Sequence, residues 1–99
     1  MEKNTPHYDL AVVKAEVRRM GSKAFTMTAR EGGRKMSLSI RQMLQIIYLL
    51  EYRMLHKSMT TYGDHRVWQD VYRPLTAIGY VYLKVSVVDD VLIVSFKGL

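Results

Sequence analysis

The stretch YVYLKVSVVDDVLIVSFK, residues 80–97, decides how the C-terminal half of this chain folds. Apolar residues alternate on both sides of Asp89 and Asp90, the pattern of two antiparallel strands joined by a tight turn. If the two aspartates form the turn, paired positions sum to 179 and Tyr82 lies directly opposite Lys97, with Cβ atoms about 5 Å apart. One face of this hairpin is apolar and the other carries tyrosine, lysine and serine, so we expect one buried face and one open face.

Upstream of the strands, apolar residues recur at helical spacing in two segments. A Thr-Pro pair precedes the first segment and predicts a helix over roughly residues 6–20. Ser39 and Gln42 have the spacing of a capping box, which predicts the main core helix from there to about Tyr52. Between them, residues 22–35 carry mixed signals and are interpreted as an irregular or short helical connection.

Alternation replaces helical spacing from residue 57 onward, in residues 57–62 and 66–73 and in the hairpin already described. Helices first and four strands afterwards predict an α+β fold, with a single domain spanning residues 1–99. In such a fold the N-terminal helices pack on one face of an antiparallel sheet, formed mainly by the C-terminal half of the chain. The other face of the sheet is then open.

A second pairing depends on the turn between the first two strands. If a three-residue loop is centred on Asp64, paired positions sum to 128, and Lys57 and Gln69 fall on the same sheet face. A two-residue loop would separate them. They join Tyr82 and Lys97 on one surface only if all four strands leave the same face open.

The composition limits the class of protein. The chain has 15 Lys and Arg against 9 Asp and Glu among 99 residues, a formal net charge of +6. A basic folded surface favours a polyanionic partner, nucleic acid before a membrane. The lack of cysteine excludes disulfides and thiolate chemistry and fits a reducing, cytoplasmic setting. We expect no signal peptide or membrane span, and, because the three histidines have no recognised ligand spacing, no metal or other cofactor.

Six segments are recognisable together at matching spacing: MEKNTPH (1–7), KSMTTY (57–62), DH (64–65), WQDVYRP (68–74), VYLK (81–84) and DVLIVSFK (90–97). In these segments the chain resembles the MqsR family of toxins. The resemblance implies a RelE-like toxin fold and an endoribonuclease that cleaves mRNA without a metal, at GC-containing triplets such as GCU. It also implies inhibition by a cognate, zinc-containing antitoxin of the MqsA type.

The resemblance assigns catalytic positions to four residues, Lys57, Gln69, Tyr82 and Lys97. Metal-free RNA cleavage requires removal of the 2′-OH proton, stabilisation of charge on the phosphorane and protonation of the leaving 5′-oxygen. We assign Lys97 to phosphate stabilisation, Tyr82 to proton transfer and Gln69 to orienting the phosphate or a base. Lys57 either activates the 2′-OH or stabilises charge, since a lysine acts as a base only when burial and neighbouring cations strongly lower its pKa.

Four further residues are expected to contact RNA through charge or base stacking: Arg66, Arg73, Lys84 and Tyr80. The chain departs from the family pattern at two positions, with His56 in place of a tyrosine and Asp89 in place of a histidine. His56 and His65 offer a rival acid and base, because imidazole titrates near neutral pH. A noncatalytic regulator that binds RNA or an antitoxin with a drifted active site is the alternative function.

Overall fold

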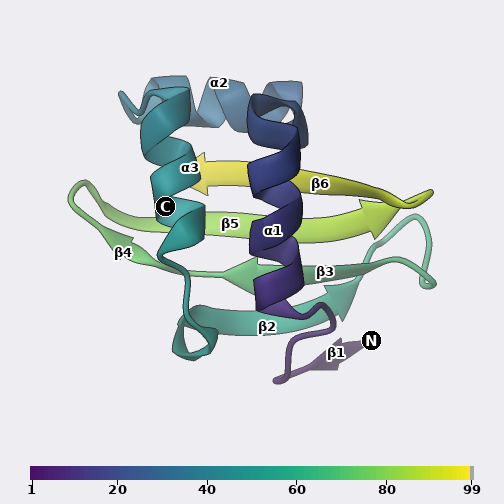
Figure 1. Ribbon diagram of the computed structural model, residues 1–99. Helices are drawn as coiled ribbons and strands as arrows, with labels where there is room; N and C mark the ends of the chain where they lie inside the picture. The colour runs from purple at the N-terminus through teal and green to yellow at the C-terminus, as the bar shows by residue number, and fades with distance from the viewer. Residues whose placement is uncertain (99) are drawn as a thin grey trace.

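The computed structural model describes residues 1–98 and arranges them as helices packed against a curled antiparallel sheet (Figure 1). In chain order the elements are β1 (Glu2–Lys3), α1 (Leu10–Met20), the 3₁₀ turn η1 (Gly21–Ala24), α2 (Met27–Lys35), α3 (Ile40–Tyr48), the 3₁₀ turn η2 (Tyr52–Met54), β2 (Leu55–Thr60), β3 (Trp68–Tyr72), β4 (Leu75–Thr76), β5 (Gly79–Val88) and β6 (Val91–Gly98). The predicted α+β order is confirmed. Within residues 1–98, no helix is long and apolar enough to cross a membrane.

The strand pairing is antiparallel throughout the sheet. β5 pairs with β3 on one side and β6 on the other, and β2 lies between β3 and the short β1 (Figure 1). The small β4 pairs with the start of β5. Tyr82 lies opposite Lys97, which confirms the predicted hairpin register. Asp89 and Asp90 have positive φ values of 50° and 64°, the left-handed conformation that two-residue hairpin turns of type I′ require.

The β2–β3 hairpin has the predicted register but a different loop. Met59 lies opposite Gln69, as expected. The amide of Thr61 still donates to the carbonyl of Val67 at 2.9 Å, so the loop between these two residues is longer than the three residues predicted. The predicted loop length is therefore wrong. The register survives because the longer loop keeps Asp64 at its centre.

Two predicted helix boundaries are also wrong. α1 begins at Leu10 rather than near residue 6, because the side chain of Asp9 accepts from two first-turn amides and caps the helix there. α3 begins at Ile40, directly after the predicted cap Ser39, but it ends at Tyr48 rather than near Tyr52. Tyr52 belongs to the separate turn η2, which leads into β2. The connection predicted at residues 22–35 is helical: η1 begins one residue earlier, at Gly21, and the short helix α2 follows it.

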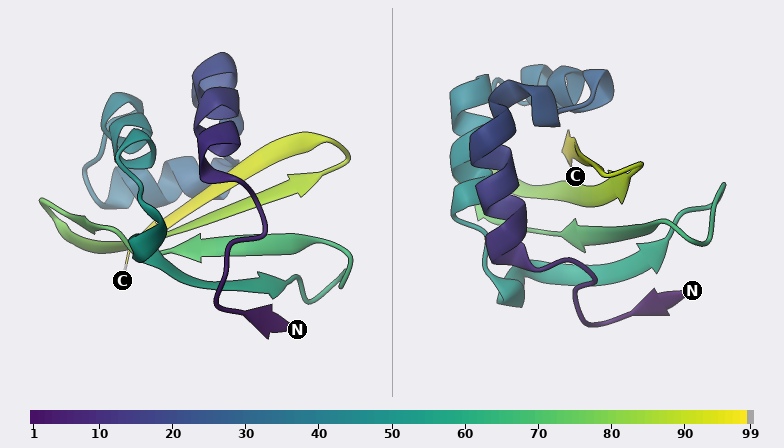
Figure 2. Two further views of the ribbon diagram at one scale, coloured as in Figure 1. Left: turned by 60° about the horizontal axis from the view of Figure 1, so that its bottom comes forward. Right: turned by 45° about the vertical axis from the view of Figure 1, so that its right-hand side comes forward.

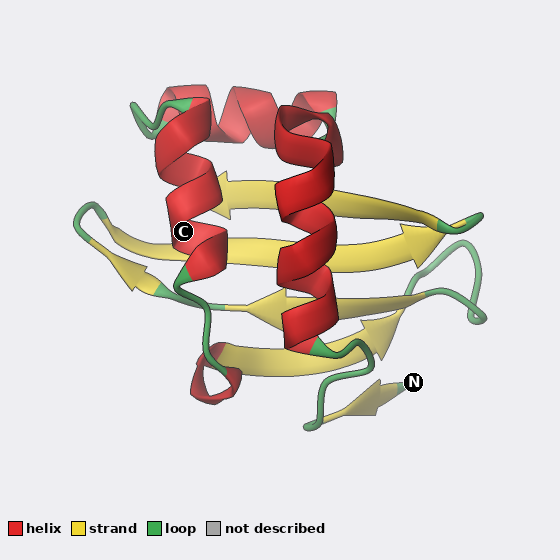
Figure 3. Ribbon diagram, in the orientation of Figure 1, coloured by secondary structure: helices red, strands yellow, loops and turns green. Residues whose placement is uncertain are grey.

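Within residues 1–98 the helices cover one face of the sheet (Figures 2 and 3). The side chains of β5 and β6 on this face are apolar and buried: Val81, Leu83, Val85, Leu92, Val94 and Phe96. They belong to one core with Val17 of α1 and Ile47 of α3, and burying each such side chain contributes about 1.5–3 kcal/mol. α2 runs along β6, where Gly32 permits close approach because a Cβ atom there would clash with the Phe96 carbonyl oxygen.

A buried carboxylate holds the N-terminal tail on the same side of the sheet. Asp70 of β3 accepts hydrogen bonds from the backbone amides of His7 and Tyr8 at 3.0 and 2.9 Å. It also accepts from the hydroxyl of Ser58 on β2 at 2.6 Å. The His7 ring stacks on Trp68 with ring centroids 5.0 Å apart. These contacts position the chain just before α1 and direct β1 along the edge of β2.

Candidate active site

The predicted catalytic residues lie on the face of the sheet that is turned away from the helices. Alternate residues of the four long strands point to this face. The register places Lys57, Val71, Lys84 and Ser95 in one row across β2, β3, β5 and β6. All four strands therefore share one open face, the condition that the sequence alone left undecided.

A cavity of about 310 Å³ lies on this open face. It is lined by His56, Lys57, Met59, Val71, Tyr82, Lys84 and Lys97. Val71 is buried and apolar, and around it stand the side chains of three lysines and one tyrosine. A concave site with this charge attracts a phosphodiester. The structure thus brings Lys57, Tyr82 and Lys97 together.

Gln69 lies on the same face but beside the cavity. It is opposite Met59 on β2 and opposite Ser86 on β5, one row away from Lys57. Met59 lines the cavity and Gln69 does not. Gln69 is therefore next to two lining residues, Met59 on β2 and Val71 on its own strand.

Lys57 has a partner that sequence reasoning missed. Its Nζ donates to Oε1 of Glu2 at 3.0 Å, and the Lys57 side chain is 35% exposed. Glu2 belongs to β1 and lies opposite Met59, at the sheet edge next to the cavity. A two-residue strand has no periodicity that could have revealed this contact. The ion pair orients Lys57 and brings one carboxylate to the border of a cationic cavity.

Arg73, which follows β3, stands beside Tyr82. Its guanidinium carbon is 5.3 Å from the ring centroid of Tyr80 and 5.6 Å from that of Tyr82. A second cavity of about 280 Å³ lies here, lined by Arg53, Met54, Leu55, His56, Arg73 and Tyr80. The two cavities are neighbours because His56 lines both. Three of the four predicted RNA contacts, Lys84, Arg73 and Tyr80, therefore surround Tyr82.

Comparison with known proteins places the chain in a family. A family model described as "Motility quorum-sensing regulator, toxin of MqsA" matches residues 5–98. The chain belongs to the MqsR toxin family. The mRNA interferase toxin MqsR of Escherichia coli (strain K12) is 47% identical to it over 97 residues, 98% of each chain. The resemblance seen in the sequence is thereby confirmed.

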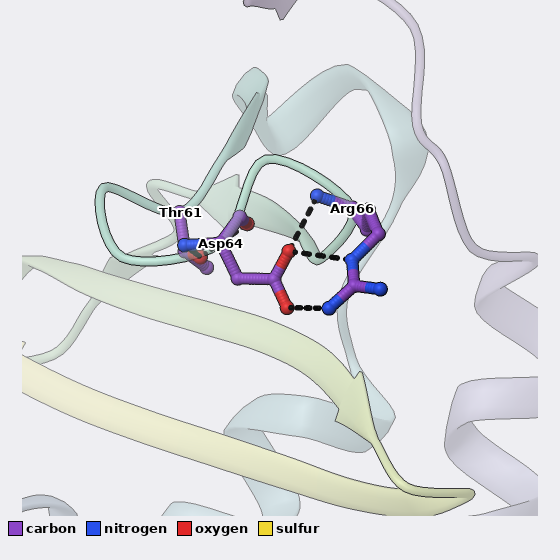
Figure 4. A network of polar contacts seen from close by, with 3 residues as sticks. All are labelled: Thr61, Asp64 and Arg66. Carbon is purple, nitrogen blue, oxygen red and sulfur yellow. Dashed lines mark hydrogen bonds and ion pairs between the residues drawn. The ribbon is translucent and has the colours of Figure 1, made fainter.

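One predicted RNA contact of this MqsR-family chain lies apart from both cavities. Arg66 is in the β2–β3 loop, where its Nε and Nη2 donate to the two carboxylate oxygens of Asp64 at 3.1 and 3.2 Å (Figure 4). The hydrogen bonds from Arg66 hold the pKa of Asp64 below its usual value, and the same contact raises the pKa of Arg66. Arg66 is exposed and already paired, so the structure does not bring it to Tyr82.

The rival pair of histidines is not brought together either. His56 is near the start of β2, whereas His65 is in the loop beyond its end. Because a strand rises about 3.3 Å per residue, most of the length of β2 separates the two imidazoles. They cannot act on one phosphate. The other departure from the family pattern, Asp89, lies in the β5–β6 turn, at the opposite end of the hairpin from Tyr82.

Proposed function

We propose that this chain is the toxin of a toxin–antitoxin pair and acts as an endoribonuclease that cleaves mRNA at the 310 Å³ cavity. The observation that carries the proposal is the placement of Tyr82 directly opposite Lys97, with Lys57 and Lys84 in the same cavity. The family match and the name of the E. coli relative support RNA as the substrate. Cleavage of mRNA implies action in the cytoplasm.

The proposed reaction is metal-independent transesterification. The 2′-oxygen attacks the phosphorus, the bond to the 5′-oxygen breaks, and the products carry a 2′,3′-cyclic phosphate and a 5′-hydroxyl. Lys97 and Lys84 are ammonium donors that stabilise negative charge on the phosphorane. Tyr82 gives its phenolic proton to the leaving 5′-oxygen, and Gln69 orients a base or a phosphate next to the cavity.

Lys57 is assigned to charge stabilisation in this proposal. Its Nζ donates to Glu2, and an ammonium group in such an ion pair has no lone pair with which to accept the 2′-OH proton. The pair holds Lys57 at the cavity border, where it donates to a phosphate oxygen. A different group must then remove the 2′-OH proton.

The same proposal covers base preference and the antitoxin. We expect cleavage at GC-containing triplets such as GCU, as the family resemblance implies. The family description, toxin of MqsA, supports an antitoxin of the MqsA type as the partner, and we expect this antitoxin to contain zinc and to block cleavage, as the family resemblance implies. Purified antitoxin of the cognate operon should abolish cleavage at equimolar ratio. Continued cleavage under saturating antitoxin would contradict this part of the proposal.

The deciding experiment is cleavage of a defined RNA that contains GCU triplets, in the presence of EDTA, with mapping of the fragment ends. We expect 5′-hydroxyl ends, a strongly reduced rate for Tyr82→Phe, and an unchanged rate for Tyr62→Phe, which alters a fully exposed loop tyrosine. Cleavage that disappears with the chelator would refute the metal-free mechanism. RNA binding without any cleavage would support the noncatalytic alternative.

A further inference from the structure

A β-bulge lies where β2 enters the candidate active site. Leu55 pairs with Tyr72, but the next paired residue of β2 is Lys57, opposite Val71. His56 is the extra residue and has no cross-strand partner in the ladder. Bulges of this kind redirect a side chain, and they are common next to active sites.

The bulge places the imidazole of His56 at the junction of the two cavities. His56 lines both the 310 Å³ cavity and the 280 Å³ cavity and is exposed to solvent. Its ring centroid is 6.2 Å from that of Tyr82, and the two rings are tilted by 58°. The two rings are therefore neighbours within aromatic contact distance but are not stacked, and both line the 310 Å³ cavity, so a phosphodiester bound in that cavity can contact both side chains.

Given the proposed RNA cleavage, on which this step rests, we infer that His56 is the general base that removes the proton from the 2′-OH. Lys57, Lys84, Lys97 and Arg73 are donors when charged, and Tyr82 is assigned as the acid. Neutral imidazole has a free nitrogen lone pair and titrates near neutral pH. Among the residues that line the two cavities, His56 is the only imidazole.

The step is balanced within the site. A ring nitrogen of His56 takes the 2′-OH proton while the 2′-oxygen forms a bond to phosphorus and the bond from phosphorus to the 5′-oxygen breaks. Tyr82 gives its proton to the 5′-oxygen. The site is left with an imidazolium and a phenolate, and a proton passes from the first to the second through solvent before the next turnover. The step requires no redox partner.

The charged and titratable side chains that line the two cavities with His56 are cations and phenols: Lys57 on β2, Tyr80, Tyr82 and Lys84 on β5, Lys97 on β6, Arg53 in η2 and Arg73 after β3. Two of these cations pair with carboxylates, Lys57 with Glu2 and Arg53 with Glu51. Lysine, arginine and tyrosine ordinarily titrate well above pH 8, so they do not produce an acidic limb in a rate profile. The competing base is the carboxylate of Glu2, which contacts Lys57 at the cavity border. Carboxylates ordinarily titrate below pH 5, which separates the two possibilities experimentally.

The test is the pH dependence of kcat/KM for cleavage of a GCU-containing RNA between about pH 4 and 8.5. We compare the wild type with His56→Gln and with His56→Phe, which keeps an aromatic ring at the bulge. His65→Gln is the matched control, because it removes an exposed imidazole outside the cavities. Glu2→Gln tests the competing carboxylate.

For the wild type we expect the rate to rise with pH through the range in which imidazole loses its proton. Both His56 variants should lose about 10²–10⁴-fold in rate at pH 7.5 and should no longer show this rise with pH. His65→Gln should keep both the wild-type rate and its rise with pH.

If both His56 variants keep the rise of the rate with pH, the inference is overturned. It is also overturned if Glu2→Gln alone removes this rise. Either outcome, with an active wild type, leaves the proposed endoribonuclease intact. An inactive wild type would instead overturn the proposed function and this inference with it.

Discussion

Replacing Asp70 by alanine should destabilise the protein far more than its single charge suggests. The carboxylate is 1% exposed and accepts from the Ser58 hydroxyl and from the amides of His7 and Tyr8, at 2.6, 3.0 and 2.9 Å. Hydrogen bonds to a charged acceptor are worth about 1.5–3 kcal/mol each, and the truncation leaves three donors without it. Because the freed tail amides regain contact with water, we expect less than the full sum, a loss of about 3–5 kcal/mol in the free energy of unfolding.

Equilibrium urea denaturation of the wild type and Asp70→Ala measures this loss. Asp90→Asn is the matched control, because Asp90 is exposed in the β5–β6 turn and asparagine accepts its positive φ. The control should stay within about 0.5 kcal/mol of the wild type. A loss below about 1 kcal/mol for Asp70→Ala would refute the reasoning, because it would mean that the hydrogen bonds to Asp70 do not hold the tail.

Three other substitutions test separate parts of the structure. Lys97→Ala should slow RNA cleavage about 10²–10³-fold. Lys23→Ala, which alters an exposed lysine of η1, should cleave at the wild-type rate. Equal cleavage rates for Lys97→Ala and the wild type would remove Lys97 from the mechanism. Tyr72→Phe should raise the free energy of unfolding by about 1 kcal/mol, because the buried hydroxyl has no hydrogen-bond partner among the described residues. A lower free energy of unfolding, measured by urea denaturation, would show that the hydroxyl has a partner. Gly32→Ala should cost at least about 2 kcal/mol in the same assay, because its Cβ would clash with the Phe96 carbonyl, and an unchanged midpoint would mean that α2 shifts freely.

The parts of the fold that could be predicted are those with a short, local cause. The Asp89-Asp90 turn determines the register of the last hairpin, and a wrong loop length around Asp64 still preserved the register of the β2–β3 hairpin. The start of α1 was misplaced because a Thr-Pro pair and Asp9 both resemble caps, and the tertiary contacts of the tail decide between them. The two-residue strand β1 has no pattern of its own and depends on contacts with residues more than 50 positions away.

In the candidate site, too, the contacts with a local cause could be predicted and those that depend on tertiary structure could not. Tyr82 and Lys97 could be paired by counting, because one tight turn fixes their separation. The contact of Lys57 with Glu2 could not, since it depends on where the N-terminal tail crosses the edge of the sheet. The position of Arg73 over Tyr82 also depends on tertiary structure, because Arg73 lies beyond the paired part of β3.

Successive side chains of β3 point to opposite faces of the sheet, so this strand contributes both to the stability of the fold and to the candidate active site. Asp70 points into the core and anchors the tail, while Gln69 and Val71, its neighbours in sequence, point to the open face. β1 pairs with β2 through two residues, and Met1 adds two hydrogen bonds with Thr60, so these contacts and the buried anchor together position the tail. The tail carries Glu2, and Glu2 orients Lys57 at the cavity. A carboxylate buried on the helix side of the sheet therefore contributes, through the tail, to the position of a lysine on the opposite face.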